Sequence, residues 1–228
     1  MEPGSNRATV SLTVISAGLS SPSTSQRLAD RISAAVRVCA QQTSRRLRLE
    51  RIEIRDLARD VTEALLTGER SGLLERAIAG VTGADALVAV TPVFNGSYSG
   101  LFKSFLDLLP PRSLTGVPVL IAATGGSHRH SLMLDYAVRP VFGYLGALTV
   151  PTEIFAATAD LADPVTDAAI TARADRAAGE LLMLTRARPA SGDDQARAGL
   201  DGTRMVRQPS TNQVDPDPAT GRETTQTR

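Results

Sequence analysis

The chain has 228 residues and a formal net charge of +1, which gives no general attraction to nucleic acid or to anionic lipid. A single cysteine excludes an internal disulfide and fits a reducing compartment. The N-terminal apolar run is too short and too interrupted for a signal peptide or a membrane span, so we expect a soluble cytoplasmic protein.

Apolar residues recur along the chain with the periods of alternating strands and helices. The run at Thr9–Ser16 predicts a buried strand, and the near-continuous run at 85–91 is typical of a parallel strand covered on both faces. Similar patterns predict strands at 46–54, 117–124 and 149–155, and helices at 24–40, 61–66, 73–81, 99–109, 131–145 and 164–186. Five strands interleaved with helices predict a doubly wound five-stranded parallel sheet in a three-layer α/β/α domain, residues 1–188.

The composition changes from Pro189 onward. Residues 189–228 contain no Ile, Phe or Tyr and carry four of the 13 prolines. Such a segment cannot bury enough apolar surface to offset its ordering entropy, so we predict a disordered tail.

The loop after the first strand has the composition of a phosphate site. In an open parallel sheet, ligands bind beyond the carboxyl ends of the strands. Here Gly18 allows a tight backbone path, and the hydroxyls of Ser20, Ser23, Thr24 and Ser25 lie near the free amides of a helix N-terminus. Neither GxGxxG nor GxxxxGK[ST] is present, which favours a monophosphate. The alternative is a Ser/Thr-rich turn with one helix N-cap.

Two further loops follow the third and fourth predicted strands and could hold a planar ring. The second loop offers backbone amides and an aromatic edge, in Pro92, Val93, Phe94 and Asn95. The third lets the backbone approach a flat ring closely and donate hydrogen bonds to its carbonyls, in Thr124, Gly125, Gly126 and Ser127. Three such loops on three strand ends indicate one composite site.

Residues 89–110, which begin AVTPVFNGSYSGLFK, together with 123–127 and 135–140, resemble the NADPH-dependent FMN reductases. The resemblance extends over 9–186 and is nearest to reductases that supply two-component flavin monooxygenases, such as the alkanesulfonate system. It implies a flavodoxin-like fold, FMN and NAD(P)H as cofactors, and hydride transfer to FMN, which then carries electrons to a partner monooxygenase. It also implies that Ser23 to Ser25 bind the FMN phosphate, while Pro92 to Asn95 and Thr124 to Ser127 hold the isoalloxazine. Family members often carry an arginine where Ser20 stands, so Arg27 is a candidate substitute.

Other electron-transfer functions remain open. An FMN-dependent reductase of quinones, azo compounds or metal ions would keep its flavin, whereas a flavodoxin-type carrier would need an acidic docking face, which the net charge disfavours. No acidic or arginine residue stands out as a selector between NADH and NADPH.

Two histidines and a predicted helix beside the third loop each allow a structural and a functional interpretation. His128 and His130 lack the further ligands of a metal site, which leaves flavin or nicotinamide contact or loop hydrogen bonding. The predicted helix 131–145 has a second apolar face, with Met133, Tyr136, Pro140 and Tyr144. We expect this face to form a subunit interface, since the resemblance implies a homodimer or homotetramer.

Overall fold

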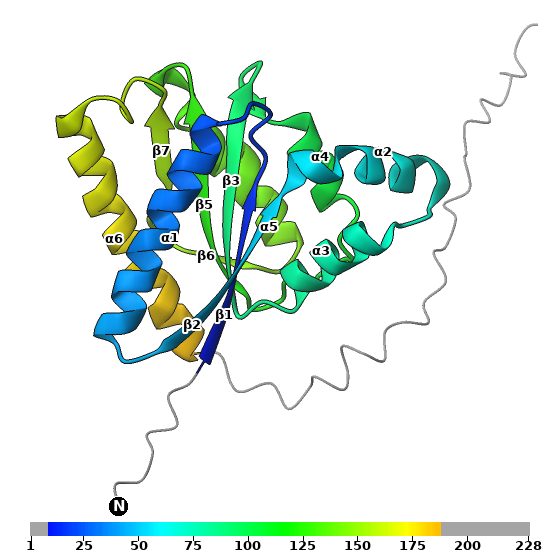
Figure 1. The fold of residues 1–228 in the computed structure, drawn as a ribbon, viewed down its shortest axis with the longest axis horizontal. Coiled ribbons are helices and arrows are strands. Elements are labelled where there is room, and N and C mark those ends of the chain that lie inside the picture. The colour runs from blue at the N-terminus through cyan, green and yellow to red at the C-terminus, as the bar shows by residue number, and fades with distance from the viewer. Residues whose placement is uncertain (1–8, 188–228) are drawn as a thin grey trace, which may run out of the picture. The chain divides into compact units, whose positions relative to one another are not determined.

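The computed structural model describes residues 9–187, which form a twisted sheet between two layers of helices (Figure 1). The predicted disordered tail, residues 189–228, lies outside the described residues, so the proposed domain boundary stays a prediction. Among the described helices, none is long and apolar enough to cross a membrane.

The sheet has the strand order β2-β1-β3-β5-β6, which is the order of a flavodoxin-like fold. The strands are β1 Thr9–Ser16, β2 Arg46–Glu53, β3 Ala86–Phe94, β4 Ser97–Tyr98, β5 Pro118–Gly125, β6 Leu148–Thr149 and β7 Ile154–Ala157. β1, β2, β3 and β5 pair in parallel. Their registers set Ser16 beside Val90 and Pro92 beside Thr124, so the loops that follow β1, β3 and β5 emerge at one edge.

Within residues 9–187 the sheet has seven strands instead of the five predicted, and the expected strand at 149–155 is the main error. It is divided into β6 and β7, which both pair in parallel with β5 but at different places. Pro151 lies in the gap and has no amide hydrogen to donate to a ladder. The other added strand, β4, pairs antiparallel with the end of β3.

Successive side chains of a strand point to opposite faces of the sheet and so pack into two separate hydrophobic cores. Val10, Leu12 and Val14 of β1 enter the core that α1 (Thr24–Gln42) and α6 (Pro164–Ala187) cover. Ile15 enters the opposite core, which the remaining helices cover: α2 Ala58–Thr67, α3 Gly72–Thr82, α4 Gly100–Leu106 and α5 Arg139–Tyr144. The three-layer α/β/α prediction is therefore confirmed.

The helix predicted at 131–145 is present from Leu134 to Tyr144, but it starts later than predicted and is not α-helical throughout. The structure has a short 3-10 turn at His128–His130, a π-helical turn at Leu134–Val138, and only then α5. Pro140 cannot donate the helical hydrogen bond to residue 136, and the preceding amide, that of Arg139, reaches five residues back to the Leu134 carbonyl. The proline thus converts one turn from α to π geometry.

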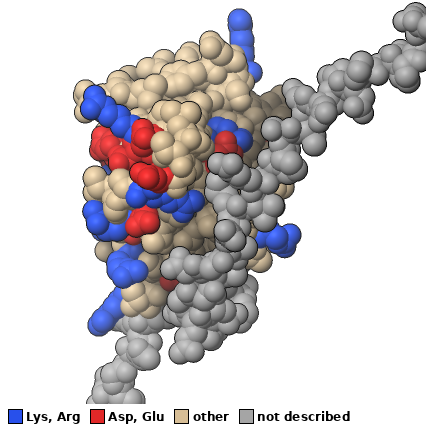
Figure 2. All heavy atoms as spheres, turned by 90° about the vertical axis from the view of Figure 1, so that its right-hand side faces the viewer, with Lys and Arg blue, Asp and Glu red and all other residues tan. Residues whose placement is uncertain are grey.

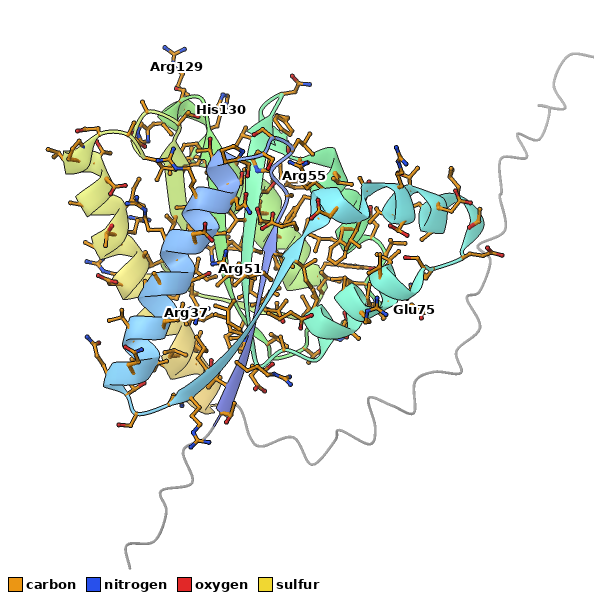
Figure 3. All side chains as sticks on the ribbon, viewed as in Figure 1. Arg37, Arg51, Arg55, Glu75, Arg129 and His130 are labelled. Atoms are coloured by element: carbon orange, nitrogen blue, oxygen red, sulfur yellow. The ribbon has the colours of Figure 1, made fainter. Side chains whose placement is uncertain are left out.

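The second apolar face of this segment is only partly as predicted. Tyr136 and Tyr144 are 80% and 77% exposed, and Leu132 joins them at 62%, but Met133 is buried. On the face drawn in Figure 2, acidic and basic side chains lie beside one another and leave broad uncharged areas. Figure 3 places Arg129 and His130 beyond the carboxyl ends of the sheet strands.

Candidate functional site

The loop after β1 turns tightly because Gly18 has no side chain. A Cβ at Gly18 would lie 2.1 Å from the Ser23 Oγ, so the loop cannot take this path with any larger residue. Ser23 is the N-cap of α1, and its Oγ accepts a hydrogen bond of 2.9 Å from the Gln26 amide. The amides of Thr24 and Ser25, the first two residues of the helix, have no intrahelical acceptor.

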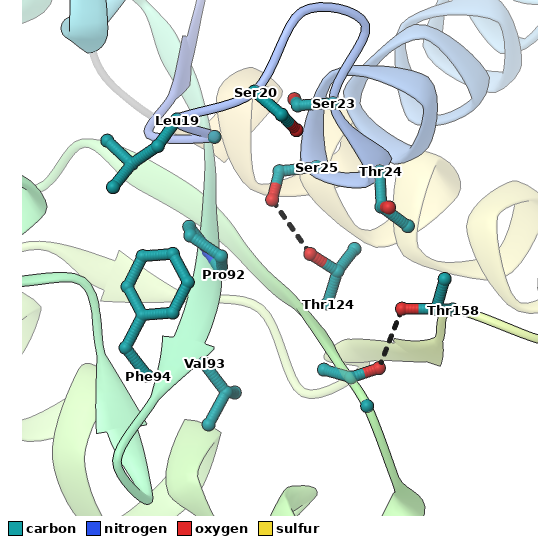
Figure 4. A pocket seen from close by; sticks show the side chains of 13 residues that line it. Leu19, Ser20, Ser23, Thr24, Ser25, Pro92, Val93, Phe94, Thr124 and Thr158 are labelled. Carbon is teal, nitrogen blue, oxygen red and sulfur yellow. Dashed lines mark hydrogen bonds between the residues drawn. The ribbon is translucent and has the colours of Figure 1, made fainter.

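A buried pair of hydroxyls joins the first loop to the third (Figure 4). The Ser25 Oγ lies 2.7 Å from the Thr124 Oγ1, and the two side chains are 1% and 3% exposed. Ser25 belongs to the first turn of α1, and Thr124 to the end of β5. This contact therefore connects the predicted phosphate site with the predicted ring site across 99 residues of sequence.

The second loop is a β-ribbon and not an irregular loop. β3 continues through Phe94 and pairs with β4, and the turn between them has positive φ at Asn95 (48°) and Gly96 (81°). Two successive positive φ values at Asn-Gly are typical of a type I′ hairpin turn. The ribbon leaves Phe94 44% exposed, and Asn95 occupies its tip.

The two glycines of the third loop have different surroundings. A Cβ at Gly125 would lie 2.9 Å from the Phe155 Cζ, so this glycine is needed for packing. A Cβ at Gly126 would have nothing within 4 Å, so the backbone there faces open space. The Thr158 amide donates to the Gly125 carbonyl at 2.9 Å, which ties the loop to the turn after β7.

These segments enclose a cavity of about 390 Å³ between the end of β3, the end of β5 and the N-terminus of α1 (Figure 4). Eleven of the residues predicted from the sequence line it: Gly18, Ser20, Ser23, Thr24, Ser25, Pro92, Val93, Phe94, Thr124, Gly125 and Gly126. Two predicted residues, Asn95 and Ser127, do not. Asn95 is at the ribbon tip, and the Ser127 Oγ accepts a hydrogen bond from the Arg129 amide as the cap of the 3-10 turn.

Two lining residues, Leu19 and Thr158, were not predicted. Leu19 adjoins the hydroxyl loop and could have been found by extending that loop. Thr158 follows a strand whose position the sequence pattern misplaced, so only the fold reveals it.

None of the residues that line this cavity is charged. The positive end of the α1 dipole points to it, and the first turn of α1 contains no acidic residue to neutralise that end. Arg27, the candidate replacement for a family arginine, does not line the cavity, and its guanidinium donates to the Leu161 carbonyl at 2.9 Å. A phosphate here would therefore be held by amides, hydroxyls and the helix dipole.

His128 lies just outside the cavity and forms a loop contact. Its Nε2 is 3.0 Å from a carboxylate oxygen of Asp160, and its ring lies 6.0 Å from that of Phe155. Asp160 also accepts a hydrogen bond of 2.7 Å from the Ala157 amide. Among the described residues there is no group of three side chains that could hold a metal ion.

The backbone at Gly126 is unobstructed, and the N-terminus of α1 is lined with hydroxyls, which suits a ligand that combines a flat ring with a phosphate. Fold and site together define a flavodoxin-like α/β protein with a site suited to FMN.

Comparison with known proteins agrees with this class. Residues 10–161 match the family model of the NADPH-dependent FMN reductases. The chain is 44% identical over 134 residues to the NADH-dependent FMN reductase SfnE of Pseudomonas putida, a match that covers 58% of this chain and 72% of that protein. It is 38% identical over 109 residues to the FMN reductase (NADPH) of Pseudomonas aeruginosa, and this match covers 48% of this chain and 59% of that protein.

A solved structure, an oxidoreductase from Corynebacterium diphtheriae, is 45% identical and superimposes with a TM-score of 0.75, over 81% of this chain and 100% of that one. The chain belongs to the NADPH-dependent FMN reductase family. It is thus an oxidoreductase of NAD(P)H and FMN, as the sequence predicts.

Proposed function

We propose that the uncharged cavity at the carboxyl ends of β3 and β5 binds FMN, and that this chain reduces FMN with NAD(P)H and releases it to a monooxygenase. The observation that carries the proposal is the convergence of the α1 N-terminus and the Gly125–Gly126 backbone on one cavity. The hydroxyls of Ser23, Thr24 and Ser25 would hold the phosphate. The isoalloxazine would lie between Pro92 to Phe94 and Thr124 to Gly126.

The residues present fit the ligand in two respects. The free amides at the start of α1 and the hydroxyls around them are donors, which a phosphate monoester needs on each oxygen. Gly126 offers a stretch of backbone that no side chain covers, so a flat ring can approach its amide closely.

Bound FMN supplies a ring that accepts hydride from reduced nicotinamide, and the protein positions the two partners. Phe94 would cover one edge of the ring and exclude water there. No lining residue carries a carboxyl, an amine, an imidazole or a thiol, so the hydroxyls of this cavity bind and orient but supply no general acid or base.

Weak retention of the flavin is the reason to propose a separate partner. Hydrogen bonds to an anion from neutral groups lack the bidentate ion pairing that an arginine would add. Reduced FMN can then leave and serve a monooxygenase. A flavodoxin-type carrier would instead need an acidic docking surface, and the face in Figure 2 carries acidic and basic groups side by side.

The exposed apolar residues Leu132, Tyr136 and Tyr144 support a homodimer or homotetramer. They project from the segment that follows the third loop, and a further cavity of about 480 Å³ lies beside Tyr144. Exposed aromatic residues grouped on one surface are typical of protein interfaces.

The test is steady-state oxidation of NADPH and of NADH with free FMN varied from none to saturation. We expect purified protein that is nearly colourless and a rate that rises hyperbolically with FMN. A yellow protein that survives dialysis and turns over a quinone or an azo dye without added FMN would contradict release and favour the retained-flavin reductase.

A further inference from the structure

A third cavity, of about 450 Å³, lies against β7 and is lined by residues from three parts of the chain. His128 comes from the 3-10 turn after β5, Phe155 from β7, and Arg173 and Arg176 from α6. Ile170, also from α6, adds apolar surface. We refer to this as the β7 cavity.

The β7 cavity shares a wall with the proposed flavin cavity. Gly125 and Gly126 line the flavin cavity, and His128, two residues further along the chain, lines the β7 cavity. In the turn after β7, Thr158 lines the flavin cavity and Asp160 lines the β7 cavity. Phe155 lies so close to Gly125 that a Cβ there would clash with its ring. A ligand that reaches from one cavity into the other therefore crosses only this strand-end wall.

The two cavities differ in charge. The flavin cavity has no charged lining residue, whereas two guanidinium groups and one imidazole line the β7 cavity. Its one carboxylate, Asp160, is 8% exposed and is already bonded to His128 and to the Ala157 amide. The uncompensated charge of the β7 cavity is therefore positive.

Both arginines are available for a ligand. Within residues 9–187, no carboxylate lies within ion-pair distance of Arg173 or Arg176, although Arg31 of α1 pairs with Asp167 on the same helix α6. Arg173 uses only its Nε, which donates to the Glu153 carbonyl at 2.5 Å, so its terminal nitrogens remain for another acceptor. Spaced three residues apart, the two arginines are neighbours on one helical face.

We propose that the β7 cavity binds a phosphate group of the nicotinamide nucleotide, with Arg173 and Arg176 as its ligands. This inference rests on the proposed function. Arginine presents a planar set of donors that matches the oxygens of a phosphate. With the nicotinamide over the flavin, the rest of the nucleotide would extend past the Gly125–Gly126 wall along β7. Phe155 and Ile170 offer apolar surface to the adenine.

Two phosphates of the nucleotide have this chemistry, namely the 2′-phosphate of NADPH and the pyrophosphate common to NADPH and NADH. The test compares Arg173→Gln, Arg176→Gln and the double variant with the parent, by KM for each nucleotide at saturating FMN. Arg37→Gln is the matched control, because Arg37 is an exposed arginine of α1 that lines neither cavity.

We expect each variant to raise the KM for the nucleotide about tenfold. This is the lower end of the loss expected when a hydrogen bond to a charged group is removed, and it applies because both arginine side chains are exposed to solvent. The value of kcat and the Kd for FMN should stay within about twofold. A rise for NADPH alone identifies the 2′-phosphate, and an equal rise for NADPH and NADH identifies the pyrophosphate. The inference is overturned if neither KM changes, if the Kd for FMN rises equally, or if Arg37→Gln has the same effect.

Failure of the proposed function would look different. In that case the parent itself would not oxidise either nucleotide with FMN. Calorimetric titration of the parent and the double variant with NADP⁺ would then test the cavity alone, and absent or unchanged binding would refute it.

Discussion

The buried hydrogen bond between Ser25 and Thr124 connects the two halves of the proposed FMN site, and Ser25→Ala should therefore have two separable effects. One concerns the free energy of unfolding of the ligand-free protein. The other concerns the affinity for FMN.

The stability effect follows from burial. Ser25→Ala leaves the Thr124 hydroxyl, 3% exposed, without its partner at 2.7 Å. An unsatisfied buried hydroxyl costs about 1–3 kcal/mol. Thr124→Val should lower the free energy of unfolding by a similar amount, because it leaves the Ser25 hydroxyl without a partner. The double variant leaves no hydroxyl without a partner. It should therefore be less destabilised than the sum of the two single variants, with a coupling free energy of about 1 kcal/mol.

The affinity effect depends on the phosphate. If Ser25 also contributes to the phosphate site, a lost hydrogen bond to a charged group, about 1.5–3 kcal/mol, should weaken FMN binding by about 10- to 150-fold. Riboflavin has no phosphate and should bind the variant and the parent alike.

Urea unfolding of the ligand-free proteins measures the first effect, and quenching of flavin fluorescence on titration measures the second. Strictly additive unfolding free energies would mean that the hydroxyl pair is absent in solution. Equal losses of FMN and riboflavin affinity would place the phosphate elsewhere and leave Ser25 with a structural role only.

Three further predictions test separate parts of the molecule. Gly126→Ala should leave the melting temperature unchanged or slightly raised but weaken FMN binding, whereas Gly125→Ala, whose Cβ would meet Phe155 at 2.9 Å, should lower the melting temperature. Burial raises the pKa of Glu53 above its ordinary 4.5, so the folded state holds this proton more tightly than the unfolded state. Stability should therefore fall as pH rises from 4.5 through the raised pKa, and Glu53→Gln should gain stability relative to the parent between pH 4 and pH 7, as measured by urea unfolding. Tyr136→Glu should lower the mass measured by light scattering if this residue lies in a subunit interface; an unchanged mass would place any interface elsewhere.

The cavity proposed to bind FMN could largely be predicted from the sequence because its determinants are local. The loop at 16–25, between the first strand and the first helix, determines where the hydroxyls and the helix amides meet. The apolar run at 85–91 determines the position of β3 in the sequence. A parallel sheet then aligns strand ends without further information. Eleven of thirteen predicted residues consequently line one cavity.

Two of the differences between the predicted and the observed structure arise from signals of one or two residues that compete with the longer patterns. Asn95-Gly96 is a hairpin signal, and the resulting ribbon carries Asn95 away from the cavity lining. Pro151 interrupts the apolar run at 149–155. In the same stretch the Arg139 guanidinium donates hydrogen bonds to the Val150 carbonyl at 3.2 Å and to the Glu153 carboxylate at 2.7 Å. Periodicity over several residues averages over such interruptions.

The arginines of the β7 cavity could not be found from periodicity at all. Arg173 and Arg176 occupy the outward face of α6, where charged residues are expected simply because that face is solvated. Their lack of carboxylate partners depends on tertiary placement. Only the position of β7, which the sequence pattern misplaced, sets Phe155 and His128 opposite them.

The different charge of the two cavities has a consequence for turnover. A reductase that releases its flavin must bind FMN loosely enough to let it go, yet it must still hold the nucleotide while hydride moves. Neutral donors at the α1 N-terminus and paired guanidinium groups at β7 would divide these tasks between two cavities. The nucleotide could then be held by its own phosphates while the flavin stays free to exchange. An arginine at Ser20 would shift the balance by strengthening the phosphate site, and the flavin would then leave more slowly.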